Sequence, residues 1–119
     1  MSIFAKVLVL LIGLEHLYIL YMEMFLWTHP KTLKKFNMTP EFAQASKALA
    51  GNQGLYNGFL AAGLLWSLAD PSGCGKLIAI FFAGCVLVAG IYGGFTAIKK
   101  IFYIQALPAA VTLAVLLFT

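Results

Sequence analysis

The sequence predicts an all-α fold, a single integral membrane domain built as a four-helix bundle. Of the 119 residues, 62% are hydrophobic and only 10% are charged, whereas about a quarter of the residues in a soluble domain are charged. The mean hydropathy is +0.94. A helix needs about 20 residues to cross the hydrocarbon core of a bilayer, and the chain supplies four segments of that length. They are residues 3–27, 48–68, 76–98 and 101–119.

The first segment, residues 3–27, carries ionisable side chains inside an apolar run. Glu15, His16 and Glu23 fall within a sector of roughly 100° when the segment is drawn as a helix. An ionisable side chain at the centre of a span costs about 2.5 to 3.5 kcal/mol, so these three are candidates for function and should face the bundle interior. The segment ends in bulky residues, 24–27, where a signal peptidase requires small ones. We therefore interpret it as the first span.

The connection that follows, residues 28–36, is short and rich in lysine. We expect this connection to lie along the lipid surface, with its Leu and Phe side chains inserted into the bilayer. A helix start comes next, because Thr39 can cap a helix and Pro40 suits the first helical position. We expect the second helix from about Pro40 to Leu68, with its membrane-spanning part from residue 48 onward.

This second helix has two opposed faces. One is a strip of small residues that lets a neighbouring backbone approach closely, comprising Gly51, Gly54, Gly58, Ala61 and Ala62. The opposite face is polar and carries Asn52, Gln53, Tyr56 and Asn57. We expect the small-residue strip to pack, within the bundle or between the subunits of a homo-oligomer, and the polar face to serve a site.

Two further spans complete the predicted bundle. Residues 70–75 contain one Pro and two Gly, which is a signal for a tight turn. Lys99 and Lys100 mark the turn into the fourth span, which holds Gln105 and Pro108 near its start. The two cysteines are too few for a disulfide framework and lack the spacing of metal ligands, so we assign them no role.

The distribution of lysines in the short loops predicts the orientation of the chain in the membrane. Five lysines fall on one side of the predicted bundle: Lys31, Lys34, Lys35, Lys99 and Lys100. Only Lys6 and Lys76 fall on the other side. We therefore expect a protein of the cell membrane with both termini outside the cytoplasm. The net charge of +4 calls for no nucleic-acid partner, because lysines at span ends meet the anionic head groups of membrane lipids.

Polar side chains from all four spans reach similar depths when depth is counted at about 1.5 Å per residue from the cytoplasmic end. One level in the cytoplasmic half contains Glu23, Asn52, Gln53, Thr96 and Gln105. Nearer the midplane come Glu15, His16, Tyr56, Asn57 and Tyr92. Lipid cannot satisfy these groups, so we expect a polar cavity that binds a small solute, a proton or a lipophilic ligand. Hydrogen bonds between helices are the structural alternative for each Asn, Gln and Tyr.

Three functions remain open at this point. In a transporter-like protein, Glu15 and Glu23 change protonation in the cavity. In a membrane enzyme acting on a lipid or lipophilic substrate, Glu23 or His16 serves as general acid or base while the polar face of the second helix orients the substrate. An accessory subunit would use its glycine faces to pack against partners. We expect no metal and no cofactor, since the side chains of adjacent residues on a helix diverge by about 100° and cannot easily share one ion.

Several stretches together resemble a family catalogued as domain of unknown function 1304, small four-span membrane proteins of bacteria and some fungi. They are Glu15-His16-Leu17-Tyr18, residues 23–27, the run from Asn52-Gln53-Gly54 to Leu64, and residues 88–93 and 105–109. The resemblance covers nearly the whole chain. It implies four spans and the grouping of six polar residues, and it implies no activity. The six are Glu15, His16, Glu23, Asn52, Gln53 and Gln105.

Overall fold

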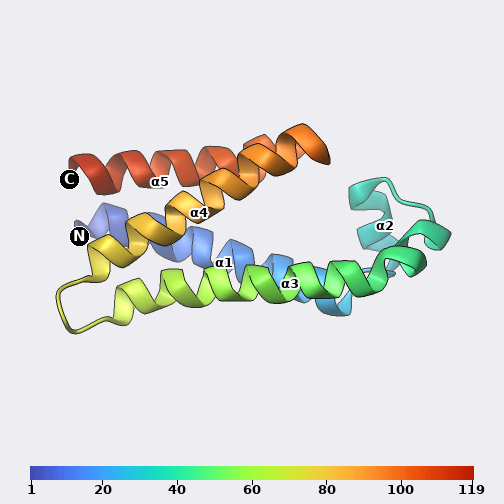
Figure 1. The fold of residues 1–119 in the computed structure, drawn as a ribbon, viewed down its shortest axis with the longest axis horizontal. Coiled ribbons are helices and arrows are strands. Elements are labelled where there is room, and N and C mark those ends of the chain that lie inside the picture. The colour runs from blue at the N-terminus through green and yellow to red at the C-terminus, as the bar shows by residue number, and fades with distance from the viewer. The chain divides into compact units, whose positions relative to one another are not determined.

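The structure, a computed structural model, describes residues 1–119 and is all-α, as predicted. Figure 1 shows its helices, whose bounds are α1 (Ile3–Phe25), α2 (Pro30–Phe36), α3 (Pro40–Ala69), α4 (Gly75–Thr96), the π-helical turn η1 (Phe102–Ala106) and α5 (Leu107–Phe118). The chain forms two compact units. The first unit comprises Met1–Leu14 and Leu60–Thr119, and the second comprises Glu15–Phe59.

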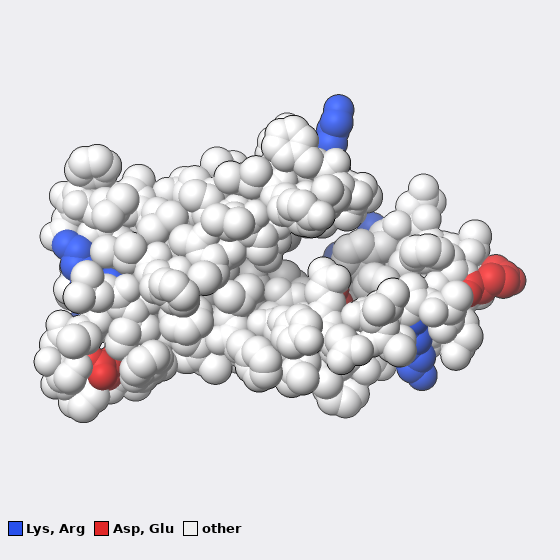
Figure 2. All heavy atoms as spheres, in the orientation of Figure 1, with Lys and Arg blue, Asp and Glu red and all other residues white.

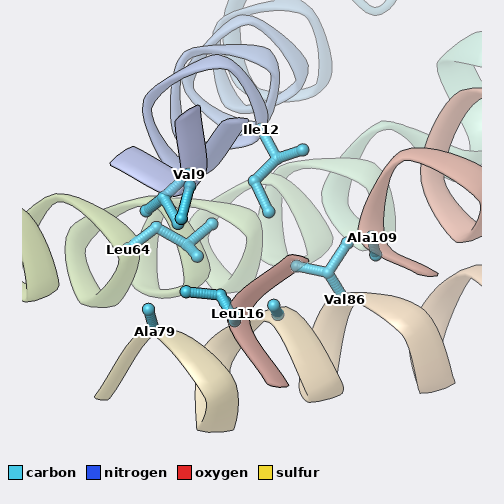
Figure 3. Close-up of a cluster of buried hydrophobic side chains, with 9 residues drawn as sticks. Val9, Ile12, Leu64, Ala79, Val86, Ala109 and Leu116 are labelled. Atoms are coloured by element: carbon cyan, nitrogen blue, oxygen red, sulfur yellow. The ribbon is translucent and has the colours of Figure 1, made fainter. Parts of the chain in front are cut away.

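The first unit is built around a core of small and branched apolar side chains contributed by four helices. Figure 3 shows this cluster, which consists of Ala5, Val9 and Ile12 of α1, Leu64 of α3, Ala79, Ala83 and Val86 of α4, and Ala109 and Leu116 of α5. Nearly half of these residues are alanines, whose small side chains allow close approach between helix backbones.

Helices α4 and α5 lie side by side and antiparallel (Figure 1), and glycine sets how closely they approach. A Cβ atom added to Gly90 would lie 2.5 Å from the backbone nitrogen of Ala106. Gly94 faces the ring of Phe102 in the same way. The ring of Phe102 also meets that of Phe95 edge to face, with centroids 5.1 Å apart. A larger residue at either glycine would therefore push η1 away from α4.

The π-helical turn η1 follows from Pro108. Proline has no N–H, and in a regular helix its ring collides with the carbonyl four residues earlier. Here the Leu107 N–H donates to the carbonyl of Phe102, five residues earlier, so the turn widens before α5 continues. The fourth predicted span, residues 101–119, is one helical segment with this wider turn near its start.

The turn between α3 and α4 is organised by Asp70. Its Oδ2 accepts hydrogen bonds from the Ser72 hydroxyl (2.6 Å) and from the backbone N–H groups of Ser72 and Cys74 (3.2 Å each). Gly73 adopts a φ of 89°, a left-handed conformation that glycine tolerates. The tight turn predicted from the Pro and Gly content of residues 70–75 is confirmed.

Both chain termini lie at the same end of the first unit (Figure 1). The hydroxyl oxygens of Ser2 and Thr119 are 3.4 Å apart. The helices that begin and end the chain are therefore held together at that end.

The second unit joins the later half of α1 to the earlier half of α3 through α2. Helix α2 is capped by His29, whose Nδ1 accepts a hydrogen bond from the Lys31 N–H, and it has Pro30 at its first helical position. It ends at Asn37 in the left-handed conformation. Trp27 contacts both α3 and α2. Its Nε1 donates to the Ser46 hydroxyl at 3.0 Å, and its ring centre lies 5.5 Å from that of Phe36. The short basic connection thus contains a helix of its own.

The small-residue strip of α3 packs against α1 over part of its predicted length. A Cβ atom added to Gly54 would lie 2.8 Å from Cγ of Met24, and one added to Gly58 would lie 2.5 Å from Cδ1 of Leu20. Gly51 has no such neighbour within 4 Å, and Ala62 is exposed. Within the chain, the contact with α1 is therefore shorter than the whole strip and does not include Gly51 or Ala62. Packing of these two residues between subunits stays a prediction.

Candidate functional site

A buried carboxyl group and a buried amide form the centre of the candidate site in the second unit. The Asn57 Nδ2 on α3 donates a hydrogen bond of 2.6 Å to the Glu23 Oε1 on α1. Each residue is only 8% exposed. Gly54, one turn before Asn57, lies against the Cβ of Glu23, so the absence of a side chain there lets the two helices come close enough for this bond.

The Glu23–Asn57 pair can serve either state of the carboxyl group. An asparagine amide offers N–H donors and a carbonyl acceptor. The Nδ2 can donate to an ionised carboxylate, and the carbonyl oxygen can accept from a protonated one after the amide turns. The arrangement can therefore hold or release a proton without leaving a partner unsatisfied.

A second polar pair lies on α1 about 10 to 12 Å before Glu23, as judged from the rise of a helix. His16 is fully buried, and its Nδ1 lies 3.9 Å from the Oε1 of Glu15. That carboxylate oxygen is buried with no hydrogen-bond partner. A buried acceptor without a donor is costly, which marks Glu15 as the less satisfied of the two acids.

The polar face predicted on α3 is divided in the structure. Asn57 faces inward, whereas Asn52, Gln53 and Tyr56 are exposed, and the Asn52 Nδ2 donates to the carbonyl of Ala48 in its own helix at 3.0 Å. The reason is angular. At 100° per residue, Asn57 lies about 60° from Gly54 around the helix, and the other three lie about 100° to 160° away. Packing of the glycines against α1 thus turns only Asn57 inward.

Three predicted site residues belong to the first unit. Tyr92 and Thr96 on α4 are exposed, and the Thr96 hydroxyl donates to the carbonyl of Tyr92 at 2.7 Å. Gln105 lies in η1 and is partly buried. Their grouping with Glu23 stays a prediction.

The second unit also contains a cavity that the sequence did not predict. Its volume is about 460 Å³, and its lining residues come from α1, α2 and the link between them: Tyr18, Met22, Leu26, His29, Lys31, Thr32 and Lys35. The sequence contained one signal for this cavity. Pro30 suits the first position of a helix, and in a helix that starts there Lys31 and Lys35 lie one turn apart on the same face.

Two further features bear on what the site can do. Among residues 1–119, no three His, Cys, Asp or Glu side chains are grouped so as to hold a metal ion. Helices α1 and α4 are long and apolar enough to cross a membrane, judged by length and composition.

Comparisons with known proteins agree with the family resemblance. A family model described as "Protein of unknown function (DUF1304)" matches residues 10–117. The uncharacterized protein YpaA of Lactococcus lactis subsp. lactis (strain IL1403) is 36% identical over 107 residues, which cover 88% of this chain and 89% of that protein. No solved structure matches the chain. The chain therefore belongs to the family of proteins of unknown function DUF1304.

Proposed function

We propose that the chain is an integral membrane protein that crosses the bilayer four times and binds a proton at the Glu23–Asn57 pair, in the manner of a transporter. The four crossings are α1, the part of α3 from residue 48 onward, α4, and η1 with α5. The apolar character of α1 and α4 supports two of the crossings directly.

The exposed surface of the helices supports burial in lipid. Large apolar side chains are exposed along α1, α4 and α5, among them Phe4, Leu11, Phe81, Val88 and Leu117. On the face drawn in Figure 2, nearly all atoms belong to uncharged residues. Extended apolar surface of this kind marks contact with a membrane or a partner protein.

The termini support an even number of crossings. Ser2 and Thr119 approach each other at one end of the first unit, and a chain whose two ends leave the bilayer on the same side crosses it an even number of times. Together with four helical segments in the core of that unit, this favours four crossings over three.

One observation carries the functional part of the proposal, the burial of Glu23 with a neutral hydrogen-bond partner. Packing alone would be served more cheaply by a neutral residue, because an acidic side chain within an apolar span is expensive and commonly marks a proton or ion pathway. Asn57 compensates for part of that cost, and it does so in both protonation states. Glu15 and His16, about two turns earlier on α1, supply a second proton-binding position along the same helix.

Infrared difference spectroscopy of the reconstituted protein tests the proposal. A titration from acid to alkaline pH converts the C=O stretching band of a carboxylic acid into carboxylate bands. We expect one such band to disappear in Glu23→Gln and to shift in Asn57→Leu, which removes its hydrogen bond. Glu41→Gln is the matched control, because Glu41 is an exposed acid in the first turn of α3. A Glu23 signal that stays constant throughout the titration would rule out a proton-binding role.

A further inference from the structure

The cavity of the second unit combines positive charge with an apolar floor. Lys31 and Lys35 of α2 lie one turn apart on its wall. Met22 of α1 and Leu26, which directly follows α1, supply the apolar part of its lining. No carboxylate is among the lining residues, so the wall favours an anion.

Lys35 is held in place at the cavity wall. Its Nζ donates to the hydroxyl of Tyr18 at 3.0 Å and lies 4.8 Å from the centre of the Tyr18 ring. An ammonium group has three N–H donors, so two remain for a ligand after the bond to Tyr18. The contact with the ring restrains a side chain that is otherwise flexible and so lowers the entropic cost of using it for binding.

His29 and Thr32 add further polar groups to the lining of the cavity. The Nδ1 of His29 accepts from the Lys31 N–H at 3.2 Å, which places the proton of the neutral imidazole on Nε2 as a donor. Thr32 is 4% exposed and is also among the lining residues. Two ammonium groups, an imidazole N–H and a hydroxyl are donors suited to the oxygens of a phosphate group.

We propose that this cavity binds the phosphate of an anionic phospholipid, with the glycerol and the first acyl carbons lying on Met22 and Leu26. The volume of about 460 Å³ falls within the range of small-molecule sites. The apolar floor favours an amphiphile over a free phosphate ion, whose surface is polar throughout. The cavity also lies where α1 leaves its apolar stretch, the depth at which head groups are found if α1 crosses the bilayer. In this respect the inference rests on the proposed function.

Quenching of Trp27 fluorescence by brominated lipids measures binding at this position. The full chain is reconstituted in phosphatidylcholine vesicles, with Trp66→Phe as background so that only Trp27, next to Leu26, reports. Brominated phosphatidylglycerol and brominated phosphatidylcholine are compared at equal mole fraction. We expect the anionic lipid to quench more strongly. Each of Lys31→Gln and Lys35→Gln should weaken this preference by at least about tenfold, since each substitution removes a charge-assisted hydrogen bond to the phosphate.

Lys34→Gln is the matched control, because Lys34 lies on the same helix, is exposed and does not line the cavity. An equal loss of preference in Lys34→Gln would show a diffuse surface charge effect and overturn the proposal. Thr32→Val, which keeps the shape of the side chain, should also weaken the preference and serves if a lysine variant fails to fold.

The source of the phosphate is distinguished by competition. Millimolar inorganic phosphate should leave the quenching by brominated phosphatidylglycerol unchanged. Full displacement by inorganic phosphate would assign the cavity to a free ion and overturn the lipid proposal. Flotation of the protein with vesicles tests membrane insertion separately. A protein that floats without any preference for the anionic lipid would refute the lipid site and leave the proposed function intact.

Discussion

At the scale of single residues, the Glu23–Asn57 hydrogen bond determines how substitution of either side chain changes the free energy of unfolding. A buried carboxyl group that loses its hydrogen-bond donor keeps its desolvation penalty, whereas loss of both polar groups removes the penalty along with the bond. The two residues should therefore behave as a coupled pair when the stability of the protein is measured.

We predict that Asn57→Leu lowers the free energy of unfolding by about 1 to 3 kcal/mol, because Glu23 is left buried without its donor. Asn52→Leu should change it by less than about 0.5 kcal/mol, since Asn52 is exposed and bonds only within its own helix. The measurement is the unfolding of the detergent-solubilised protein by increasing SDS, followed by circular dichroism.

The double variant Glu23→Leu Asn57→Leu should be more stable than Asn57→Leu alone, because it lacks the Glu23 carboxyl group that Asn57→Leu leaves buried without its donor. Strict additivity of the two single substitutions would show that the pair is not coupled and would contradict the role given to the hydrogen bond.

At the scale of helices, the sequence predicted the elements closely and their contacts only in part. The segment predicted as the third span, residues 76–98, is helical in the structure as α4, Gly75–Thr96, because the Pro and Gly residues before it mark the start of the helix clearly. Counting residues from the cytoplasmic end predicted that Asn52 lies at the same depth as Glu23. The hydrogen bond to Glu23 instead comes from Asn57, more than one turn further along α3. Which residues of a helix meet a neighbour depends on both surfaces, and the pattern of α3 alone, with a small-residue face and a polar face, does not contain the angle at which α1 packs.

The contact between α1 and α3 is tested by substitutions in the small-residue strip. Gly54→Leu should destabilise the protein by about 1 to 3 kcal/mol, since the new side chain would collide with Met24 and with the Cβ of Glu23. Gly51→Leu, one turn away on the same helix, meets open space and should be neutral or stabilising. Equal loss of stability in the two variants, measured as the midpoint of thermal unfolding, would show that α3 uses another face.

The approach of α4 to η1 gives a stricter version of the same test. Gly90→Ala adds a single carbon 2.5 Å from the backbone nitrogen of Ala106, where no side chain can move aside, so we expect a loss of at least about 1 kcal/mol. Gly84→Ala has no neighbour within 4 Å and should gain about 0.5 to 1 kcal/mol from the better helix propensity of alanine. The same unfolding measurement should therefore show a lower stability for Gly90→Ala and a higher stability for Gly84→Ala.

At the scale of the whole molecule, the proposed topology unites two independent observations. The proximity of Ser2 and Thr119 supports the emergence of the start of α1 and the end of α5 on the same side, and the lysine count predicts that this side is outside the cytoplasm. The turn organised by Asp70 joins the third and second crossings, so on this topology it also lies outside.

Labelling of cysteine by a membrane-impermeant maleimide in intact cells tests this orientation. Cys74 lies in the Asp70 turn and is exposed, and Cys85→Ser removes the other thiol, which lies within α4. We predict that Cys74 reacts in intact cells. In a second protein lacking both native thiols, Lys34→Cys on α2 should react only after permeabilisation, because the count of five of the seven loop lysines on its side predicts a cytoplasmic position for α2. If residue 34 reacts in intact cells and Cys74 only after permeabilisation, the orientation is the opposite of the predicted one, and four crossings remain possible. If both positions react in intact cells, they lie on the same side of the membrane, and the chain between residues 34 and 74 crosses it an even number of times, which contradicts the proposed topology.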